Sequence, residues 1–479
     1  MQQKDAQLVA ALVEERGARA EEAARAVWQA AELNWREEKS AAALAAFLEE
    51  AGFRVRRGML DMPTAFIAEA GESGPVIAFL AEYDALPGLS QAAGEAAQHP
   101  LHAGGAGHGC GHNLLGAGAA LAAAALRDVL AALGVQAVVR CYGCPAEEDG
   151  GGKVFFARAG AFDDVDAVFA WHPGDANYVL GQGTLAVTGV LYRFAGRTAH
   201  AAAAPHTGRS ALDACELMNV GCNYLREHIP TGARLHYAYR DTGGTAPNVV
   251  PDHACLHYYI RAPKVREMMQ IKQRVDDVAR GAALMTGTQL TITEVDGFSD
   301  YVPNRTLGEL LAACLAETGA PDFDEEDRAL AARFAATLPP EVLRANVENT
   351  CAEAGLDAHA LDGRVLCDVT APYVHDPARC EPGSTDVGDV SYCAPTAQLY
   401  CATLALGSGG HNWQVTAQSA CRHGFAGMRA AARALALAGL RAAQDPTLLE
   451  KAREELRRTC PEGYLCPMPE QARPAPAEG

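Results

Sequence analysis

Basic residues are scarce in this 479-residue chain: 40 Lys and Arg stand against 59 Asp and Glu, a formal net charge of −19. Binding to nucleic acid depends on a positive field that attracts the phosphates, so this balance excludes nucleic acid as the main partner. Long apolar runs are also lacking. The most apolar helical stretch, residues 114–126, is mostly Ala and Gly and is shorter than the roughly 20 residues of a membrane-spanning helix. We therefore expect no membrane partner.

An apolar export segment is missing from residues 1–30, which have the pattern of a charged, Ala-rich helix. The 15 cysteines follow no regular spacing, and most lie inside apolar runs, as reduced structural thiols do. Both features predict a cytoplasmic protein. Apolar residues, by contrast, are abundant. Hydrophobic residues make up 49% and charged residues 21%, a composition that supports a large core and excludes intrinsic disorder.

Short apolar runs alternate with helical patterns through the first part of the chain. Residues 76–81, 136–142 and 165–171 are typical of buried parallel strands, and residues 114–133 of a helix between two of them. This order predicts an α/β domain. From residue 185 the order becomes strand, helix, strand, strand, helix, strand, which is the ferredoxin-like α+β unit. We predict a first α/β part at 1–184, an inserted α+β domain at 185–297, a second α/β part at 298–445, and a C-terminal helix with a disordered tail at 446–479.

Four loops carry side chains that could bind metal, and each loop follows a predicted strand or opens a predicted helix. In open α/β sheets that edge is where ligands bind. Taken singly, each loop has an ordinary structural explanation: a flexible glycine loop, a solvated acidic turn, or a histidine that packs at a strand end. Taken together they supply S, N and O donors of the types that bind Zn²⁺ or Mn²⁺. The candidate ligands are Cys110, His112, Glu148, His172 and His411.

Five donors are more than one tetrahedral ion needs, so we predict two divalent ions, zinc or manganese, that share a bridging ligand. Cys110, Glu147 and Glu148 are the candidates for that bridge. A two-metal centre with a free carboxylate beside it can activate a water molecule and stabilise a tetrahedral intermediate.

These motifs, in this order, resemble the M20 family of metallopeptidases and amidohydrolases, and within it the amidohydrolase branch. The resemblance runs from about residue 6 to about residue 443. The motifs that carry it are Ala81-Glu-Tyr-Asp-Ala-Leu-Pro87, Gly107-His-Gly-Cys-Gly-His-Asn113, Pro145-Ala-Glu-Glu148, Trp171-His-Pro173, Thr198-Ala-His-Ala201, Pro205-His-Thr-Gly-Arg-Ser-Ala-Leu-Asp213, Asn248-Val-Val-Pro-Asp252, Gly383-Ser-Thr-Asp-Val-Gly-Asp389 and His411. One departure is Asn113, where most members of the branch have Asp, and it indicates a particular subgroup.

The resemblance implies an α/β metal-binding catalytic domain with an inserted lid and dimerisation domain. It also implies roles for single residues. The five candidate ligands would bind metal, with Cys110 in place of the bridging carboxylate of other branches. Glu147 would be the general base, and Asp84 would orient a metal ligand.

The same resemblance implies roles for three residues of the inserted domain. His200 matches a lid histidine that stabilises the oxyanion, in family members often across a dimer. Asn248 and Arg261 stand where the lid supplies contacts to a substrate carboxylate. The exposed antiparallel sheet expected for this domain could also join a partner chain. We therefore expect a homodimer, with a hetero-oligomer containing a related subunit as the other possibility.

The leading hypothesis is a metal-dependent amidohydrolase. It would cleave an N-acyl amino acid or a dipeptide-like amide, such as p-aminobenzoyl-glutamate or a β-alanyl dipeptide, with a metal-activated water and Glu147 as base. A nonenzymatic binding or regulatory subunit is an alternative, against which an intact Glu147 and all five ligands argue. A thiol hydrolase that uses Cys110 and His112 is a third, but two residues apart in a glycine turn they make a poor nucleophile–base pair. Metal content and chelator sensitivity separate the three.

Overall fold

The computed structural model describes residues 2–474, and its larger sheet has seven strands in the order β1-β2-β4-β3-β5-β13-β6. The three central pairings, β3 with β4, β3 with β5 and β5 with β13, are parallel, and the strands toward both edges are antiparallel. The strands are β1 Arg54–Arg57, β2 Phe66–Ala70, β3 Val76–Glu82, β4 Val138–Cys144, β5 Ala167–Gly174, β6 Tyr178–Val179 and β13 Thr396–Ala402.

Both faces of this sheet are covered, because alternate residues of β3 belong to two different cores. Ile77 and Phe79 pack with the helices of one layer, and Ala78 and Leu80 with those of the other. The first layer holds α1 Gln2–Ala30, α2 Glu38–Glu50, α3 His112–Leu133, α7 Arg305–Thr318, α12 Arg422–Gln444 and α13 Pro446–Thr459. The second holds α4 Gly152–Arg158, α8 Glu325–Ala335, α9 Pro340–Ala354, α10 Val387–Cys393 and α11 Trp413–Gln418.

Small residues let helix α3 lie close to the sheet and to its neighbours α1 and α12. A Cβ at Gly118 would lie 2.6 Å from the ring of Trp171, so only glycine fits there. Among the described residues α3 is the one helix long and apolar enough to cross a membrane. However, 83% of its apolar window is buried inside the protein, as in the core helix of a globular domain.

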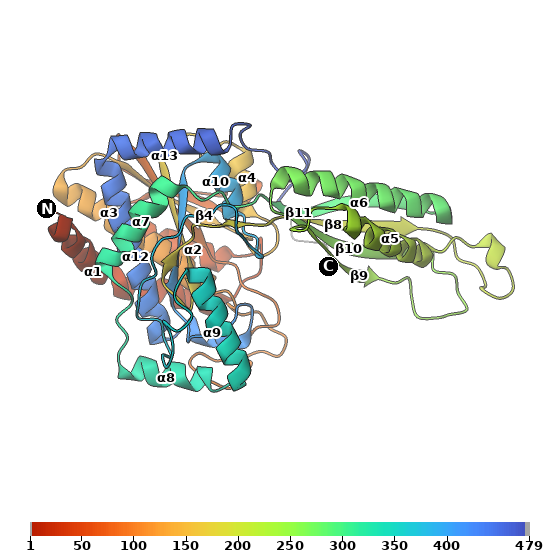
Figure 1. The fold of residues 1–479 in the computed structure, drawn as a ribbon, viewed down its shortest axis with the longest axis horizontal. Helices are drawn as coiled ribbons and strands as arrows, with labels where there is room; N and C mark the ends of the chain where they lie inside the picture. Colours follow the sequence, from red (N-terminus) through yellow and green to blue (C-terminus); the bar gives the residue numbers. More distant parts are fainter. Residues whose placement is uncertain (1, 475–479) are drawn as a thin grey trace.

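A second, smaller body extends away from the α/β domain (Figure 1). Its four-stranded antiparallel sheet has the order β11-β8-β10-β9, and two helices pack on one face of it. We call this body the lid domain. Its elements are β8 Ala186–Ala195, α5 Ala211–Leu225, β9 Arg234–Asp241, β10 His253–Ala262, α6 Val265–Thr286 and β11 Gln289–Phe298. The predicted fold class, an α/β domain with an inserted ferredoxin-like α+β domain, is confirmed.

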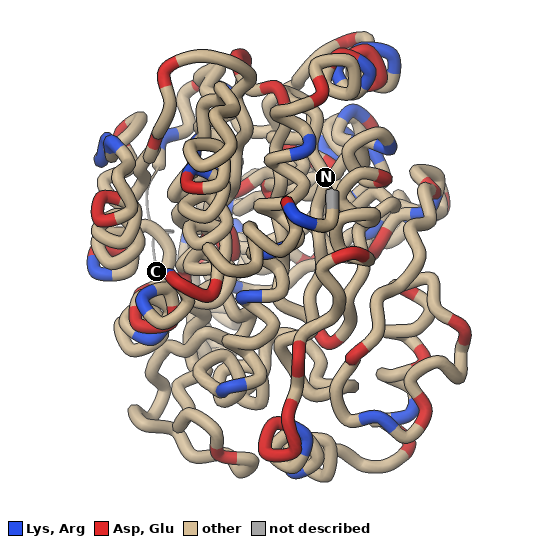
Figure 2. The backbone as a smooth tube through the Cα atoms, turned by 90° about the vertical axis from the view of Figure 1, so that its left-hand side faces the viewer, with Lys and Arg blue, Asp and Glu red and all other residues tan. Residues whose placement is uncertain are grey.

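Two short strands, β7 Gly183–Thr184 and β12 Cys380–Glu381, form a separate parallel pair near the start of the lid domain. On the face of the α/β domain opposite the lid, acidic and basic residues are interspersed along the chain (Figure 2). This mixture agrees with the net negative charge of the chain.

The segment that follows α13 corrects one expectation, because residues 461–474 pack against the protein although their composition predicts disorder. Met468 is buried against Phe298 of β11, and the hydroxyl of Tyr464 donates to Asp389 Oδ1 at 2.8 Å. The guanidinium of Arg158 donates to the carbonyl oxygens of Pro469 and Ala472 at 3.0 Å. We call residues 460–474 the C-terminal strap. The rest of the predicted tail, 475–479, lies outside the described residues.

Candidate metal centre

The strand order brings the four predicted loops to one edge of the larger sheet. Strand β3 ends at Glu82 just before Asp84, and β4 ends just before Glu147 and Glu148. His172 lies near the end of β5. The loop that follows β13 carries His411, and the turn that opens α3 carries Cys110 and His112. Because β3, β4, β5 and β13 run parallel, their carboxyl ends meet at this edge.

Two unusual backbone conformations turn the donor loops toward each other. Ala146 has a positive φ of 56°, and its N–H donates to the buried Glu37 carboxylate at 2.9 Å. This turn points the side chains of the next two residues, Glu147 and Glu148, toward the site. His411 also has a φ of 56°, and its N–H donates to the carbonyl oxygen of Gly109 at 2.9 Å. That bond ties the loop after β13 to the turn before α3 and holds His411 in a conformation that non-glycine residues rarely adopt.

The five predicted ligands form two groups of three that share Cys110. One group is Cys110, His112 and His172, the other is Cys110, Glu148 and His411, and the donor atoms within each lie within 4.8 Å of one another. Cys110 Sγ is 3.3 Å from His172 Nε2. On the other side His411 Nε2 is 3.3 Å from Glu148 Oε2. The arrangement suits two ions with the Cys110 sulfur between them.

Hydrogen bonds outside the centre fix the orientation of the two imidazoles. His112 Nδ1 donates to Asp84 Oδ1 at 2.8 Å, and His172 Nδ1 donates to the carbonyl oxygen of Pro173 at 2.7 Å. In its neutral form each ring therefore presents Nε2 to the centre as an acceptor. The other oxygen of Asp84 accepts from the backbone N–H of Glu148 at 2.9 Å. One buried carboxylate thus holds a ligand from each of the two groups.

The residues present fit a bound cation. His112 Nε2, Glu148 Oε1 and Glu82 Oε2 are buried and have no hydrogen-bond partner within residues 2–474. Each unsatisfied buried polar atom costs about 1–3 kcal/mol, and several at one point are unusual in a native protein. Their lone pairs converge with a thiol sulfur, which is the donor set that Zn²⁺ and Mn²⁺ take.

The electrostatics of the protein alone agree with this. Burial raises the pKa of Glu147, and the neighbouring Glu82 carboxylate raises it further. Burial likewise raises the pKa of the Cys110 thiol. Burial lowers the pKa of His172 to about 4, so this ring is neutral near pH 7 and its Nε2 can donate a lone pair. A cation in the centre would stabilise the charged forms of the carboxylates and the thiol.

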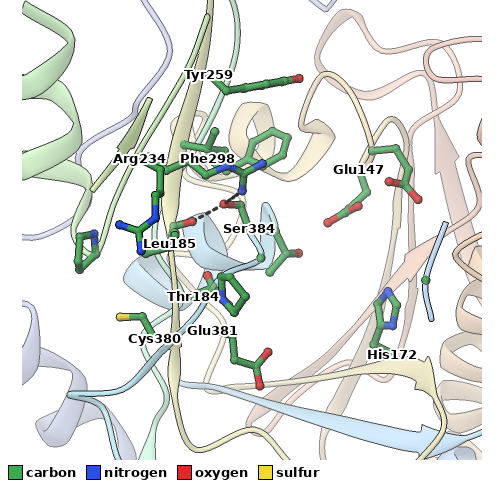
Figure 3. Close-up of a pocket in the computed structure, with 18 of the residues that line it drawn as sticks. Glu147, His172, Thr184, Leu185, Arg234, Tyr259, Phe298, Cys380, Glu381 and Ser384 are labelled. Carbon is green, nitrogen blue, oxygen red and sulfur yellow. Dashed lines mark hydrogen bonds between the residues drawn. The ribbon is translucent and has the colours of Figure 1, made fainter. Parts of the chain in front are cut away.

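A cavity of about 990 Å³ opens in front of the centre, between the α/β domain and the lid domain. Glu147 and His172 lie on one side of it, and Arg234, Tyr259 and Ser384 lie on the other (Figure 3). Arg261, predicted from the sequence as a substrate contact, also lines the cavity, and its guanidinium donates to Ser384 Oγ at 2.7 Å.

His200 and Asn248 are not brought to the centre of their own chain. Both are exposed, and they are neighbours, since the Ala201 N–H donates to the Asn248 carbonyl at 2.9 Å. Neither is among the residues that line the cavity. His200 follows the end of β8 and Asn248 precedes the start of β10, and these two strand ends are paired at the end of the lid sheet remote from the α/β domain (Figure 1).

The sequence analysis missed three charged side chains beside the centre. Glu82, Lys153 and Asp386 are buried and joined by ion pairs of 2.7 Å and 2.5 Å through the Lys153 ammonium. Glu82 belongs to a strand-end motif that drew attention only for Asp84. A buried lysine has no signal in a single sequence, since lysine is almost always a surface residue.

An α/β domain with clustered metal ligands at its sheet edge, facing a cavity under an inserted lid, defines the class of metal-dependent hydrolases. Comparison with known proteins makes this specific. The model of peptidase family M20/M25/M40 matches residues 78–386. The chain belongs to this family, and it is a metal-dependent enzyme that hydrolyses amide bonds.

Curated relatives cover nearly the whole chain. It is 42% identical over 455 residues to a p-aminobenzoyl-glutamate hydrolase subunit of Escherichia coli, covering 94% of each chain. It is 32% identical to a Xaa-Arg dipeptidase of Mus musculus, covering 90% of this chain and 88% of the relative. A solved Bacillus subtilis structure, a dinuclear metal binding peptidase from the M20 family, superposes with a TM-score of 0.54 at 18% identity. It spans 89% of this chain and 99% of that one, a likeness that shows the fold.

Proposed function

We propose that the protein is a two-metal amidohydrolase that releases an amino acid from an N-acyl amino acid or a dipeptide-like amide, such as p-aminobenzoyl-glutamate. The observation that carries the proposal is the pair of three-donor groups that share Cys110. The name of the Escherichia coli relative supports the substrate class.

In this proposal His112 and His172 would hold one ion, Glu148 and His411 would hold the other, and Cys110, which belongs to both groups, would be a ligand that they share. Two zinc or manganese ions would supply Lewis acidity that lowers the pKa of water and polarises the amide carbonyl. Asp84 keeps His112 and Glu148 in position through its two oxygens. Because a small displacement of a catalytic group slows a reaction strongly, this support contributes to the rate without touching substrate.

Glu147 is the proposed general base. Its Oε2 lies 4.0 Å from His112 Nε2 and its side chain is 12% exposed at the cavity, so it can reach a water molecule there. Unlike Glu148, it belongs to neither of the groups that contain Cys110, and its carboxylate instead lies in a third group with Glu82 and His112. Its carboxylate would take a proton from the attacking water and return it to the leaving nitrogen, which needs that proton to depart as an amine.

The cavity wall opposite Glu147 supports an anionic substrate. Arg234 and Arg261 are paired across strands β9 and β10, and both line the cavity. A guanidinium binds a carboxylate through two parallel hydrogen bonds, so Arg261 suits the carboxylate of the amino acid that leaves. The volume of about 990 Å³ accommodates an acyl amino acid with its aromatic group.

The remote positions of His200 and Asn248 support a dimer in which a second copy completes the site. In this proposal His200 of one lid domain donates a hydrogen bond to the oxyanion in the other chain's cavity, and Asn248 contacts the substrate. The partner is a second copy of this chain or a related subunit, since the name of the Escherichia coli relative describes one subunit of a hydrolase. The cytoplasm is the proposed location, supported by the fifteen cysteines, all of which are free thiols within residues 2–474.

One experiment tests the proposal. The metal-free protein is reconstituted separately with Zn²⁺ and with Mn²⁺, its metal content is measured, and hydrolysis of a panel of N-acyl amino acids and dipeptides is followed. We expect two ions per chain and turnover that chelation abolishes. Two bound ions without hydrolysis of any amide would favour a nonenzymatic binding protein, and less than one ion per chain would refute the metal centre.

A further inference from the structure

Three carboxylates lie near the imidazole of His112, and only one of them is a proposed metal ligand. Its Nε2 lies 3.4 Å from Glu82 Oε2, 3.9 Å from Glu148 Oε1 and 4.0 Å from Glu147 Oε2. Glu148 belongs to the second ion and Glu147 is the proposed base. Glu82 is the nearest of the three oxygens, and it forms a three-donor group with His112 and Glu147. It is not one of the five proposed ligands, and the proposed mechanism gives it no role.

The Glu82 carboxylate is divided between two environments. Its Oε1 accepts an ion-pair contact from Lys153 Nζ at 2.7 Å, whereas its Oε2 is buried without a hydrogen-bond partner within residues 2–474. Buried carboxylate oxygens are almost always paired, because an unpaired one loses the hydration it had in water. The free oxygen therefore points to a ligand on the side of His112 Nε2.

Lys153 makes no hydrogen bond to that oxygen. Its ammonium also contacts Asp386 Oδ1 at 2.5 Å, and its backbone N–H donates to Asp386 Oδ2 at 2.9 Å. Both side chains are fully buried, so the lysine is fixed from two directions. With His112 neutral, as a metal-bound imidazole is, one ammonium between two carboxylates leaves the three carboxylates around His112 without enough positive charge. A divalent cation at His112 Nε2 would supply it.

We propose that Glu82 is an oxygen donor to the ion held by His112, and that this carboxylate shifts the position toward Mn²⁺ over Zn²⁺. The inference rests on the two-metal centre of the proposed function. The 3.4 Å between His112 Nε2 and Glu82 Oε2 lies within the spacing that two donors, each about 2.1 Å from one ion, can have. Zinc is satisfied by four sulfur and nitrogen donors, whereas manganese prefers more ligands and harder oxygen donors, so an added carboxylate favours manganese. Lys153 is the positioning residue that directs Oε2 toward His112.

The test measures Mn²⁺ and Zn²⁺ affinities separately, by calorimetry with a competing chelator, on the metal-free full-length protein. Glu82→Gln should weaken one Mn²⁺ binding step by about 10- to 100-fold and weaken Zn²⁺ much less, so that the Mn²⁺/Zn²⁺ affinity ratio falls. Glu82→Asp withdraws the oxygen by one methylene without removing charge and should lower the same ratio. Lys153→Gln should also lower the Mn²⁺/Zn²⁺ affinity ratio, because without the ammonium Glu82 Oε2 is no longer held toward His112.

Asp389→Asn is the matched control. It changes a buried carboxylate that contacts Ser299 and Tyr464 instead of the metal ligands, and it should leave the ratio unchanged. Melting temperatures of the metal-free variants show which of them fold. The inference would be overturned if the Mn²⁺/Zn²⁺ affinity ratio were unchanged in Glu82→Gln and Glu82→Asp, or if both metals lost affinity equally. Binding of two ions by the wild-type protein would still uphold the proposed function in that case. Failure of the wild-type protein to bind two ions would overturn both.

Discussion

The adjacent residues Glu147 and Glu148 allow the proposed base and a proposed ligand to be separated by one matched pair of variants. Glutamine has the shape and volume of glutamate, so Glu147→Gln and Glu148→Gln leave packing nearly unchanged. Both side chains are close to buried, at 12% and 9% exposed, so solvent cannot readily replace either carboxylate. The two changes nevertheless remove different functions.

Glu147→Gln removes the carboxylate that accepts the proton but spares both donor groups that contain Cys110. Loss of a general base lowers the rate by about 10²- to 10⁴-fold, which is about 3–5 kcal/mol of barrier, and more where the group also protonates the leaving amine. Two ions should remain bound. Glu148→Gln replaces a carboxylate whose Oε2 lies 3.3 Å from His411 Nε2 and whose Oε1 has no hydrogen-bond partner within residues 2–474. We therefore expect this variant to lose one ion together with its activity.

The assay pairs metal content with kcat, measured at saturating substrate and in excess metal. Each variant is a control for the other, since they are neighbours in one turn and carry the same chemical change. Near-wild-type kcat in Glu147→Gln would remove this residue from the mechanism. Loss of a metal ion from Glu147→Gln, with retention in Glu148→Gln, would show that the two roles are reversed.

Three further predictions use other parts of the molecule. Cys110→Ser should weaken binding of both ions, because a soft thiolate becomes a neutral hydroxyl, and metal titration checks this. His200→Ala should lower kcat by about 10²- to 10³-fold with metal content intact, and mixing it with Glu147→Gln should restore part of the activity; heterodimers without any recovery would contradict a shared site. Burial lowers the pKa of His423 to about 4, so its neutral form stabilises the fold above pH 6.5, and this contribution, about 3 kcal/mol, is lost as pH falls toward 4. His423→Gln should therefore flatten the acid side of the stability profile in denaturant titrations, and an unchanged profile would exclude this histidine as a cause.

The donor loops could be predicted from the sequence because each ligand stands in a short motif at a strand end. Parallel strands then bring those ends together without any knowledge of side-chain contacts. Cys110 and His112 share one glycine turn, so their proximity is local. Pairs such as Cys110 with His172, which are 62 residues apart, followed from the sheet edge alone.

The Lys153 cluster and the C-terminal strap could not be predicted in this way. Lys153 and Asp386 are 233 residues apart, and only the folded chain shows that one ammonium serves two carboxylates. The strap has the proline-rich composition of a disordered tail, yet a few buried contacts, those of Met468 and Tyr464 among them, fix it to the surface. The composition of a segment is an average over its residues, so it does not predict that one or two of them make buried contacts.

The strap also links the end of the chain to movement of the lid. Glu462 forms an ion pair with Arg266 of the lid helix α6 at 2.6 Å, whereas Tyr464 and Pro469 are bound by the α/β domain. Met468 rests on Phe298, where the lid sheet returns to that domain. Any rotation of the lid must therefore displace or stretch the strap, which acts as a tether across the joint. A chain shortened at residue 459 would lack this tether and keep all five proposed metal ligands, so its metal content, measured against the full chain, should be unchanged.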